Sequence, residues 1–527
     1  MSPFKSQGYV YHNNMENKFF LNKHGDPIFV TGLQCHNSST GSPLIEKAIR
    51  AVKKFGGNVL EAPVYWYWLE PQEGVYDVSH IRQLIQQVRD ADLKLVILWF
   101  ATNKNGHPNY VPEYVKTNPK KYRLAVGADG APVPSMSPHC EATLTADKRA
   151  FVELIKCIKE EDQDYGTVLA VQVENETGLG GTDRDYSNIA QRDYEKPVPE
   201  VLRDIEIKNS GASKKDSSWR GQFGRYAHEV FTAWHHAVYT NCIASAGKEI
   251  MDITMFANAM LGDSIDEAGL SYNSGGPVVR VLDIWKAGAP AIDLLCPDIY
   301  NPGRDEYEHF CRAYSRADNP LFIPESGFWG TSSAINIIRA AAEHRAIGIC
   351  CFGAESALND DGEINDESKE AAVSFKIVNS IAPLLIKYHG TERIYPLIQE
   401  EFTVKKHIET PGYHITANFD IKRMFGKGNP SRGRGILVQT DEHEFYLSGD
   451  NVGLDFLRRP DPDNEIPYIQ LKCRQATQLN FLTVEEGHFE DGKWVADFCR
   501  NGDQSNYELY ANDGEIVRIR LNPHIGL

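Results

Sequence analysis

The sequence predicts an α/β fold, a (β/α)8 TIM barrel followed by a smaller all-β, sandwich-like domain. Up to about residue 385, eight short apolar runs alternate with segments of helical periodicity. The rival open, doubly wound sheet usually carries a glycine-rich phosphate turn after its first strand, and the sequence has none there. Beyond that region, short alternating or apolar runs separated by turn residues replace the helical periodicity.

The barrel elements follow one another in a regular order. The first strand is expected at 28–33, and residues 43–55 carry apolar side chains at helical spacing before Gly56-Gly57 stops the helix. The same alternation then repeats, as expected when parallel strands are joined by crossover helices. The remaining strands are expected at 58–64, 93–99, 167–178, 252–258, 292–300, 320–325 and 348–352, and the remaining helices at 79–91, 147–162, 222–246, 278–287, 304–316, 333–343 and 368–382.

The chain of 527 residues exceeds the range of a single core, so more than one domain is expected. Residues 1–27 are predicted to form an N-terminal hairpin that leads into the catalytic barrel of residues 28–385. Residues 386–527 are predicted to form the β-sandwich domain, with strands such as 435–440 and 516–521.

The composition is that of an ordinary globular protein, with 42% hydrophobic and 10% aromatic residues. A net charge of −17 argues against nucleic acid or an anionic membrane as a partner. The N-terminus shows no signal peptide, and no apolar run is long enough to span a membrane. The ten cysteines show no Cys-x-x-Cys spacing, so we expect reduced thiols in a cytoplasmic protein; a leader removed beforehand would make it a secreted one.

Two glutamates stand at the ends of predicted strands, where barrel enzymes place their chemistry. The apolar run of the fourth strand breaks into Glu174, Asn175 and Glu176, and the seventh strand ends at Glu325. Burying an unpaired carboxylate costs several kcal/mol or more, so carboxylates at these positions indicate a functional role. A strand that simply runs out into a polar loop is the structural alternative for either one alone. Because both strands end at the same rim, we expect Glu176 and Glu325 to face each other.

A facing pair of carboxyl groups is what glycoside hydrolysis requires. One carboxyl protonates the leaving oxygen and the other attacks the anomeric carbon, at a separation of about 5–5.5 Å in retaining enzymes. Glu176 must then hold its proton until it donates it, and Glu325 must be ionised. No metal and no cofactor are expected, because the carboxyls supply both acid and nucleophile. His235 and His236, adjacent on a predicted helix, point in different directions and are not assigned to a metal.

Aromatic residues follow several of the same strands. Sugars present apolar C–H faces that stack on aromatic rings, while their hydroxyl groups bind Asn, Glu and Lys side chains. Trp329, after the seventh strand, is a candidate for such stacking, with core or rim packing as the structural alternative. Glu61, in the middle of the second strand, either points into the barrel and binds a hydroxyl group or pairs with a cation. The other aromatics are Tyr65, Trp66, Tyr67, Trp68, Trp99, Phe100, Tyr300 and Phe328.

A set of short motifs extends from about residue 28 to 390. They are Val59-Leu-Glu61, Trp68-Leu-Glu70-Pro71, Trp99-Phe100, Lys104-Asn105-Gly106, Gln172-Val-Glu174-Asn175-Glu176, Arg184-Asp185-Tyr186-Ser187, Ser274-Gly-Gly-Pro277, Asp283-Ile-Trp-Lys286, Pro297-Asp298-Ile-Tyr300 and Ile323-Pro-Glu325. Together they resemble glycoside hydrolase family 35, the β-galactosidases of the large retaining clan with an Asn-Glu pair on strand four. The chain is most similar to the microbial branch whose barrel is followed by a small β-domain.

The resemblance implies that Glu176 is the acid/base, that Glu325 is the nucleophile and that Asn175 holds the 2-hydroxyl group of the galactosyl ring. It also places Asn105 and Tyr300 near the sugar.

Lys104, in the motif of Asn105, is counted with the substrate-binding residues. Two positions depart from the family pattern. Asn103-Lys104-Asn105 stands where animal and plant members have a Cys/Ala-Glu-Trp segment, and Pro63 stands where they have a tyrosine.

We therefore expect a retaining exo-β-galactosidase that hydrolyses terminal β-D-galactosyl residues of oligosaccharides or polysaccharide side chains. Another retaining β-glycosidase, a β-glucosidase or arabinosidase, stays open because the residues that read the hydroxyl groups set the sugar. A catalytically silent carbohydrate-binding barrel is the alternative from another class. Family members often associate, so a homo-oligomer is expected. The long segment 179–221, which leaves directly from Glu176, is expected to form part of the pocket wall.

Overall fold

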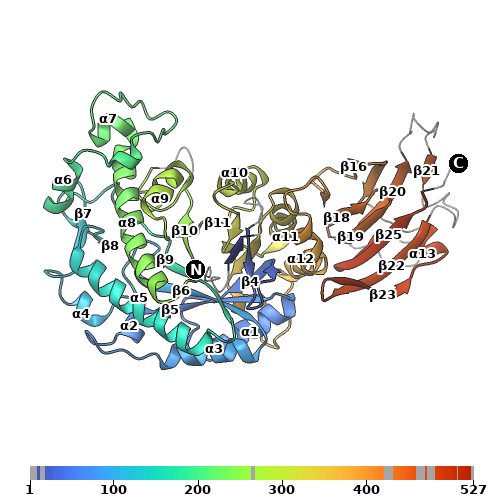
Figure 1. The fold of residues 1–527 in the computed structure, drawn as a ribbon, viewed down its shortest axis with the longest axis horizontal. Coiled ribbons are helices and arrows are strands. Elements are labelled where there is room, and N and C mark those ends of the chain that lie inside the picture. Colours follow the sequence, from blue (N-terminus) through green and yellow to red (C-terminus); the bar gives the residue numbers. More distant parts are fainter. Residues whose placement is uncertain are drawn as a thin grey trace, which may run out of the picture.

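The computed structural model describes residues 9–11, 18–262, 267–419, 431–458, 469–471, 481–506 and 509–523. A barrel of parallel strands surrounded by helices is followed by a separate domain of antiparallel strands (Figure 1). This arrangement confirms the predicted fold class.

The barrel sheet runs in the order β12-β14-β4-β5-β6-β9-β10-β11-β13, and all neighbours are parallel. Most of its residues are buried, because one face fills the barrel and the other is covered by helices. The strands fall on the eight predicted runs. They are β4 (Val30–Gln34), β5 (Val59–Tyr65), β6 (Lys94–Lys104), β9 (Val168–Asn175), β10 (Thr254–Met260), β11 (Leu294–Ile299), β12 (Phe322–Ile323), β13 (Glu325–Ser326) and β14 (Gly348–Phe352).

Pro324 divides the seventh predicted run into β12 and β13. Proline has no N–H to donate to a strand ladder, so the pairing changes partner at this residue. β12 pairs with β14 through Phe322 and Gly348, whereas β13 pairs with β11 through Glu325 and Asp298. The two halves of this run thereby bring the two ends of the sheet together.

A helix follows each strand run and covers the outside of the barrel (Figure 1). The predicted helices are all present, with boundaries shifted by a few residues. For example, α8 begins at Ala227 rather than 222, because Gly224, at φ 54°, ends the short helix α7 (Trp219–Phe223) just before it. The helices are α1 (Leu44–Phe55), α3 (Ser79–Asp90), α5 (Glu141–Asp162), α8 (Ala227–Ile250), α9 (Leu282–Gly288), α10 (Arg304–Tyr314), α11 (Gly330–Ile338) and α12 (Lys369–Lys387).

Shorter elements decorate the loops and the N-terminal end. A small antiparallel sheet, β1-β2-β3, spans the predicted N-terminal hairpin, of which residues 1–8 and 12–17 lie outside the described part of the chain. The short elements are β1 (Tyr9–Tyr11), β2 (Lys18–Leu21), β3 (Pro27–Ile28), α2 (Trp66–Leu69), α4 (Glu113–Lys116), β7 (Leu124–Val126), β8 (Pro132–Met136), α6 (Asn188–Tyr194), 3-10 turns at Glu200–Leu202, Gly224–Tyr226, Val279–Val281 and Ala354–Ala357, a π-helical turn at Arg339–Glu343, and α13 (Asp503–Asn506).

The C-terminal domain packs two antiparallel sheets face to face. One sheet runs β15-β18-β19-β25-β22-β23, and the other contains β16, β17, β20, β21 and β24. Alternate residues, such as Phe445 of β19 and Phe456 of β20, fill the space between the sheets. The strands are β15 (Ile394–Ile398), β16 (Lys405–Thr410), β17 (Tyr413–Asn418), β18 (Arg434–Asp441), β19 (Glu444–Asp450), β20 (Val452–Arg458), β21 (Ile469–Leu471), β22 (Phe481–Glu490), β23 (Lys493–Cys499), β24 (Tyr510–Ala511) and β25 (Glu515–Leu521).

The opposite face of the first sheet packs against the barrel. Ile436, Val438 and Tyr446 belong to the same apolar core as the barrel helices. The fully buried Arg434 adds polar contacts, since its Nε donates to Ser374 Oγ of α12 at 2.8 Å.

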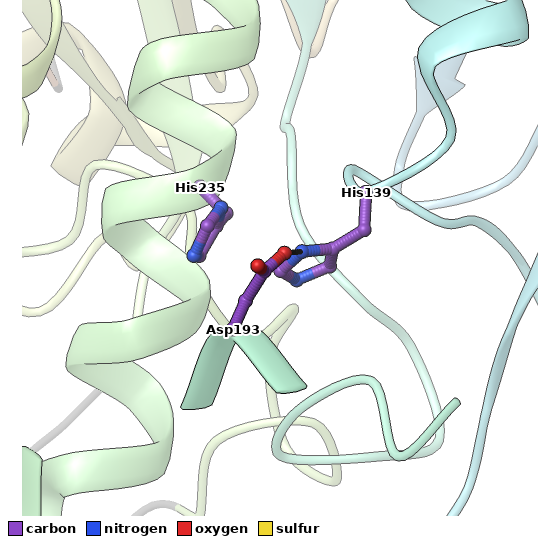
Figure 2. A group of neighbouring side chains, drawn as sticks. All are labelled: His139, Asp193 and His235. Atoms are coloured by element: carbon purple, nitrogen blue, oxygen red, sulfur yellow. Dashed lines mark hydrogen bonds and ion pairs between the residues drawn. The ribbon is translucent and has the colours of Figure 1, made fainter. Parts of the chain in front are cut away.

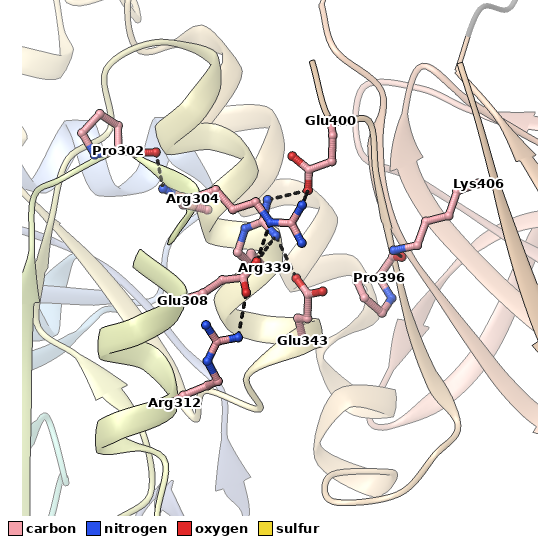
Figure 3. Close-up of polar contacts among 10 residues, drawn as sticks. Pro302, Arg304, Glu308, Arg312, Arg339, Glu343, Pro396, Glu400 and Lys406 are labelled. Carbon is pink, nitrogen blue, oxygen red and sulfur yellow. Dashed lines mark hydrogen bonds and ion pairs between the residues drawn. The ribbon is translucent and has the colours of Figure 1, made fainter. Parts of the chain in front are cut away.

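A second buried arginine joins the two domains (Figure 3). Arg339 donates to Glu308 of α10 at 2.9 Å, to Glu343 at 3.0 Å and to Glu400, just after β15, at 2.8 Å. Its side chain is only 2% exposed, so these carboxylates neutralise a charge that water barely reaches.

Two expectations from composition can be compared with the described residues. None of the helices seen there is long and apolar enough to cross a membrane. The nine cysteines seen there are free thiols.

Candidate active site

Three buried carboxyl groups meet at the carboxyl ends of the barrel strands. Glu176 follows β9, Glu325 begins β13 and Asp298 lies near the end of β11. One carboxyl oxygen of each lies within 4.8 Å of the other two. The exposed fractions are 5%, 3% and 4%, respectively. The structure therefore brings together the two predicted catalytic glutamates and adds a third carboxyl.

The backbone leading into Glu176 is unusual. Glu174 and Glu176 have φ values of 64° and 45°, in the left-handed region that residues other than glycine rarely adopt. Contacts with the neighbouring strand β10 and with the loop after it hold the strained segment: the Glu176 N–H donates to Asn258 Oδ1 at 3.0 Å, and Asn273 Nδ2 donates to the Glu176 carbonyl at 2.9 Å. Such strain persists only where the surroundings enforce it, and it clusters at functional sites.

Glu174 and Glu176, on either side of Asn175, bind in different surroundings. Glu174 binds within the barrel wall, where its oxygens accept hydrogen bonds from Thr102 Oγ1 at 2.8 Å and from the Asn103 N–H at 2.6 Å. It also faces the buried Asp147, and burial together with that charge raises the pKa of Glu174. Glu174 therefore supports the strand, while Glu176 faces Glu325.

Glu325 accepts hydrogen bonds on both oxygens. Gln34 Nε2 and Asn175 Nδ2 each donate to Oε1 at 3.0 Å, and the Tyr300 hydroxyl donates to Oε2 at 2.7 Å. Asn258 Nδ2 approaches the same Oε1 at 3.4 Å. Donors on both oxygens fix the orientation of the carboxylate, which suits a nucleophile.

Glu176 has the electrostatics of a general acid. Burial raises its pKa to about 7; the charge of Glu325 adds to the increase and Lys104 opposes it. Burial and the charges of Glu325 and Glu176 likewise raise the pKa of Asp298. Glu176 thus has a raised pKa, while Glu325 accepts hydrogen bonds from four donors. This difference matches the division of roles between an acid and a nucleophile.

The predicted substrate-binding residues Lys104 and Asn105, at the end of the third strand, both donate hydrogen bonds to Asn175. Lys104 Nζ donates to Asn175 Oδ1 at 2.8 Å, which fixes the side-chain amide so that its Nδ2 points to Glu325. Asn105, at φ 56°, donates its backbone N–H to the Asn175 carbonyl at 3.2 Å. Both residues thus lie beside the pair Glu176 and Glu325.

The other predicted binding residues differ in accessibility. Tyr300 and Trp329 are 41% and 42% exposed, and Trp329 also packs against the buried Phe328. Glu61 has no exposed surface, and burial together with the charge of Glu325 raises its pKa. Neither oxygen of Glu61 has a hydrogen-bonding partner among the described oxygen and nitrogen groups, and none of the ion pairs described involves it; the Cys350 thiol lies beside it.

Most of the remaining predicted aromatics pack in the barrel core. Trp66 and Trp99 are fully buried, whereas Trp68 is 38% exposed. The segment 179–221 is anchored at its start, where Leu179 and Ser274 form a β-bridge. Its later residues pack among themselves and against α8: the Arg184 guanidinium lies over the rings of Tyr186 and Tyr194 at 3.9 and 4.3 Å, and the Tyr194 ring contacts Phe231 of α8.

Sequence reasoning missed Gln34, Asn258 and Asp298 as site residues. Each stands at or close to the end of a predicted strand, on the rim that already held Glu176 and Glu325. That position was the signal that could have identified them, because polar side chains at the carboxyl ends of barrel strands converge on one site.

Comparisons with known proteins give two matches to family models. Residues 39–227 match the glycoside hydrolase family 42 model, described as β-galactosidase, and residues 371–512 match a domain of unknown function, DUF5597. No curated protein matches the chain.

Solved structures with a similar fold include glycosidases. The catalytic domain of β-amylase from Paenibacillus polymyxa is 14% identical, with a TM-score of 0.48 over 65% of this chain and 97% of that one. The β-galactosidase from Bacillus circulans sp. alkalophilus is 15% identical, with a TM-score of 0.49 over 67% and 56%. That from Rahnella sp. R3 is 13% identical, with a TM-score of 0.48 over 73% and 58%. The chain thus spans less than two thirds of the length of these two β-galactosidases.

The expected resemblance to family 35 is corrected by the family match. The Asn-Glu pair on strand four belongs to a whole clan of retaining enzymes, so it does not separate the families. The departures at Asn103–Asn105 and at Pro63 are the positions where this chain leaves the family 35 pattern. Over residues 39–227, which include Glu176, the chain is instead similar to the β-galactosidases of glycoside hydrolase family 42, and this match supports a glycosidase.

Proposed function

We propose that the protein is a retaining exo-β-galactosidase that releases terminal β-D-galactosyl residues from oligosaccharides or polysaccharide side chains. The observation that carries the proposal is the pair Glu176 and Glu325, with oxygens within 4.8 Å at the barrel mouth. This proximity supports a retaining mechanism, in which the carboxyl groups lie about 5–5.5 Å apart, over an inverting one, in which they lie about 6.5–9.5 Å apart.

In the first step, a Glu325 oxygen attacks the anomeric carbon while Glu176 donates its proton to the glycosidic oxygen. The bond to that oxygen breaks, the aglycone leaves as an alcohol, and a galactosyl ester forms on Glu325. The pKa of about 7 supports this role for Glu176, because about half of the carboxyl groups carry the proton at neutral pH.

In the second step, Glu176 is a carboxylate and takes a proton from water. The water oxygen attacks the anomeric carbon, the ester bond to Glu325 breaks, and both carboxyls return to their starting states. Two inversions give a product with the β-configuration of the substrate.

The preference for a terminal sugar rests on the near-complete burial of the carboxyls. The exposed fractions of 5% for Glu176 and 3% for Glu325 support a narrow site that admits one terminal sugar, whereas an internal segment of a polysaccharide needs an open cleft. Asn175, held by Lys104 and bonded to Glu325, is positioned to contact the 2-hydroxyl group next to the reacting carbon. The accessible rings of Tyr300 and Trp329 are candidates for stacking on the sugar.

A panel of p-nitrophenyl glycosides tests the proposal, with the β-D-galactoside, the β-D-glucoside and the α-L-arabinoside compared by kcat/KM. We expect the galactoside to be the best substrate and β-galactose to be the first product seen by NMR. The exposed Glu195→Gln should match the wild type, while Glu325→Gln should be inactive. α-Galactose as the first product would exclude retention. A preference for the glucoside or arabinoside would reassign the substrate. If no glycoside were hydrolysed, the barrel would be a carbohydrate-binding protein without catalytic activity.

A further inference from the structure

A second group of metal-ligating side chains lies outside the catalytic pocket (Figure 2). His139 lies in the loop before α5, Asp193 is on α6 and His235 is on α8. One potential ligand atom of each residue lies within 4.8 Å of those of the other two. Figure 2 shows the three side chains converging from three separate segments.

The two imidazole rings are held in place by an aromatic neighbour. Phe231, one helical turn before His235 on α8, stacks on His139 with ring centroids 5.3 Å apart and contacts His235 at 4.5 Å. The centroids of the two histidine rings are only 4.1 Å apart. Packing of this kind fixes the rings before a ligand arrives, which a binding site requires.

Asp193 completes the set. Its Oδ2 lies 2.9 Å from His139 Nδ1, and its Oδ1 accepts a hydrogen bond from Lys196 Nζ at 2.6 Å. In a tetrahedral zinc site, ligand bonds of about 2.0–2.1 Å place neighbouring ligand atoms about 3.4 Å apart. The His139–Asp193 contact needs to open by about 0.5 Å to admit an ion, which would replace the proton that the two groups now share.

We propose that His139, Asp193 and His235 bind a zinc ion, with water as the fourth ligand. Two imidazole nitrogens and one carboxylate oxygen form a ligand set that zinc accepts, and three protein ligands leave one position for solvent. A cavity of about 460 Å³ lined by His139, Ser137 and Tyr186 borders the site on its His139 side. This proposal does not depend on the glycosidase activity.

The ion would tie the long segment 179–221 to the barrel. Asp193 belongs to that segment, while His139 and His235 belong to the loop before α5 and to the barrel helix α8. Zinc would therefore stabilise the folded chain by binding it in preference to the unfolded chain.

Isothermal titration of the full-length, EDTA-dialysed protein with zinc chloride tests the site. We expect one equivalent to bind, with an increase in Tm, and cobalt to give the visible spectrum of a four-coordinate ion. His235→Ala and Asp193→Asn should each lose this binding and the increase in Tm. The Asp193 side chain is 23% exposed, so Asp193→Asn should fold even if His235→Ala does not.

Two controls separate this site from other acceptors of metal. His228, on the same helix, lies 2.7 Å from Asp183, so it reproduces a histidine–carboxylate contact without a third ligand; His228→Ala should keep the binding. Glu325→Gln, which alters the carboxyl cluster of the barrel, should also keep it. The proposal is overturned if zinc does not bind, if binding survives both His235→Ala and Asp193→Asn, or if His228→Ala or Glu325→Gln abolishes it.

Discussion

The raised pKa of Glu176 predicts that the enzyme loses activity above about pH 7. A carboxyl with the ordinary pKa of 4.5 is only about 0.3% protonated at pH 7, whereas one with a pKa of about 7 is about half protonated. The environment of Glu176 therefore increases the acid form about 150-fold at neutral pH, equivalent to about 3 kcal/mol. Most of this effect comes from burial, followed by the charge of Glu325.

The sign follows from the first chemical step. Glycosylation needs the protonated form of Glu176, so kcat/KM for a substrate with a poor leaving group should stay high below the pKa and fall about tenfold per pH unit above it. Lys104 opposes the increase in pKa, so Lys104→Met should move the decline to higher pH.

The assay compares two substrates over about pH 5 to pH 9. The wild-type enzyme should show the alkaline decline with phenyl β-galactoside, because the leaving group of this substrate needs an acid. In Glu176→Gln, the residual kcat/KM for the same substrate should no longer decline at alkaline pH. Dinitrophenyl β-galactoside, whose leaving group needs no proton, should retain most of its kcat/KM in Glu176→Gln. The exposed variant Glu195→Gln should keep the wild-type profile. An alkaline decline at an unchanged pH in Glu176→Gln would show that another group controls it and would refute the reasoning.

Three further predictions test other parts of the structure. With azide as a nucleophile that needs no general base, Glu176→Ala should form the β-galactosyl azide and Glu325→Ala the α-azide; product NMR distinguishes them, and the opposite anomers would mean that the roles are reversed. Asn175→Ala should reduce kcat/KM for galactosides by about 2–4 kcal/mol of transition-state stabilisation, with a smaller loss on 2-deoxy substrates, because its contact with the 2-hydroxyl group strengthens in the transition state; equal losses would assign Asn175 to strand support alone. Arg339→Leu should lower the free energy of unfolding in urea by about 3 kcal/mol, because it leaves carboxylates at the domain interface without their buried partner. Arg312→Ala, at a site 61% exposed, should cost less than about 1 kcal/mol, and similar losses for the two arginine variants would contradict this account.

The barrel could be predicted from the sequence because its strands are buried on both faces. Runs such as residues 93–99 and 348–352 are apolar throughout, which distinguishes them from the amphipathic helices between them. The same pattern could not show that Pro324 divides a strand, since the change of partner depends on which strands are neighbours in space.

The meeting of Glu176 and Glu325 at one rim was predictable for a related reason. Glu176 and Glu325 follow apolar runs, and in a barrel all such ends share one rim. Asp298 carried the same signal, because it is a charged residue two positions before the end of an otherwise mostly apolar predicted strand. The hydrogen bond from Lys104 to Asn175 could not be predicted from the sequence. The two residues are 71 positions apart and follow different strands, so only the fold shows that they meet.

The left-handed backbone at Glu174 and Glu176 has a consequence for laboratory evolution. Each such residue costs about 1–2 kcal/mol relative to glycine, which adopts the conformation freely. At 174 the hydrogen bonds from Thr102 and Asn103 oppose a change to glycine, so a selection for heat resistance alone would favour glycine at 176, where that change removes the proposed proton donor. Libraries of this barrel screened only for survival at high temperature should accumulate stable, inactive proteins, so a screen for turnover has to accompany every round.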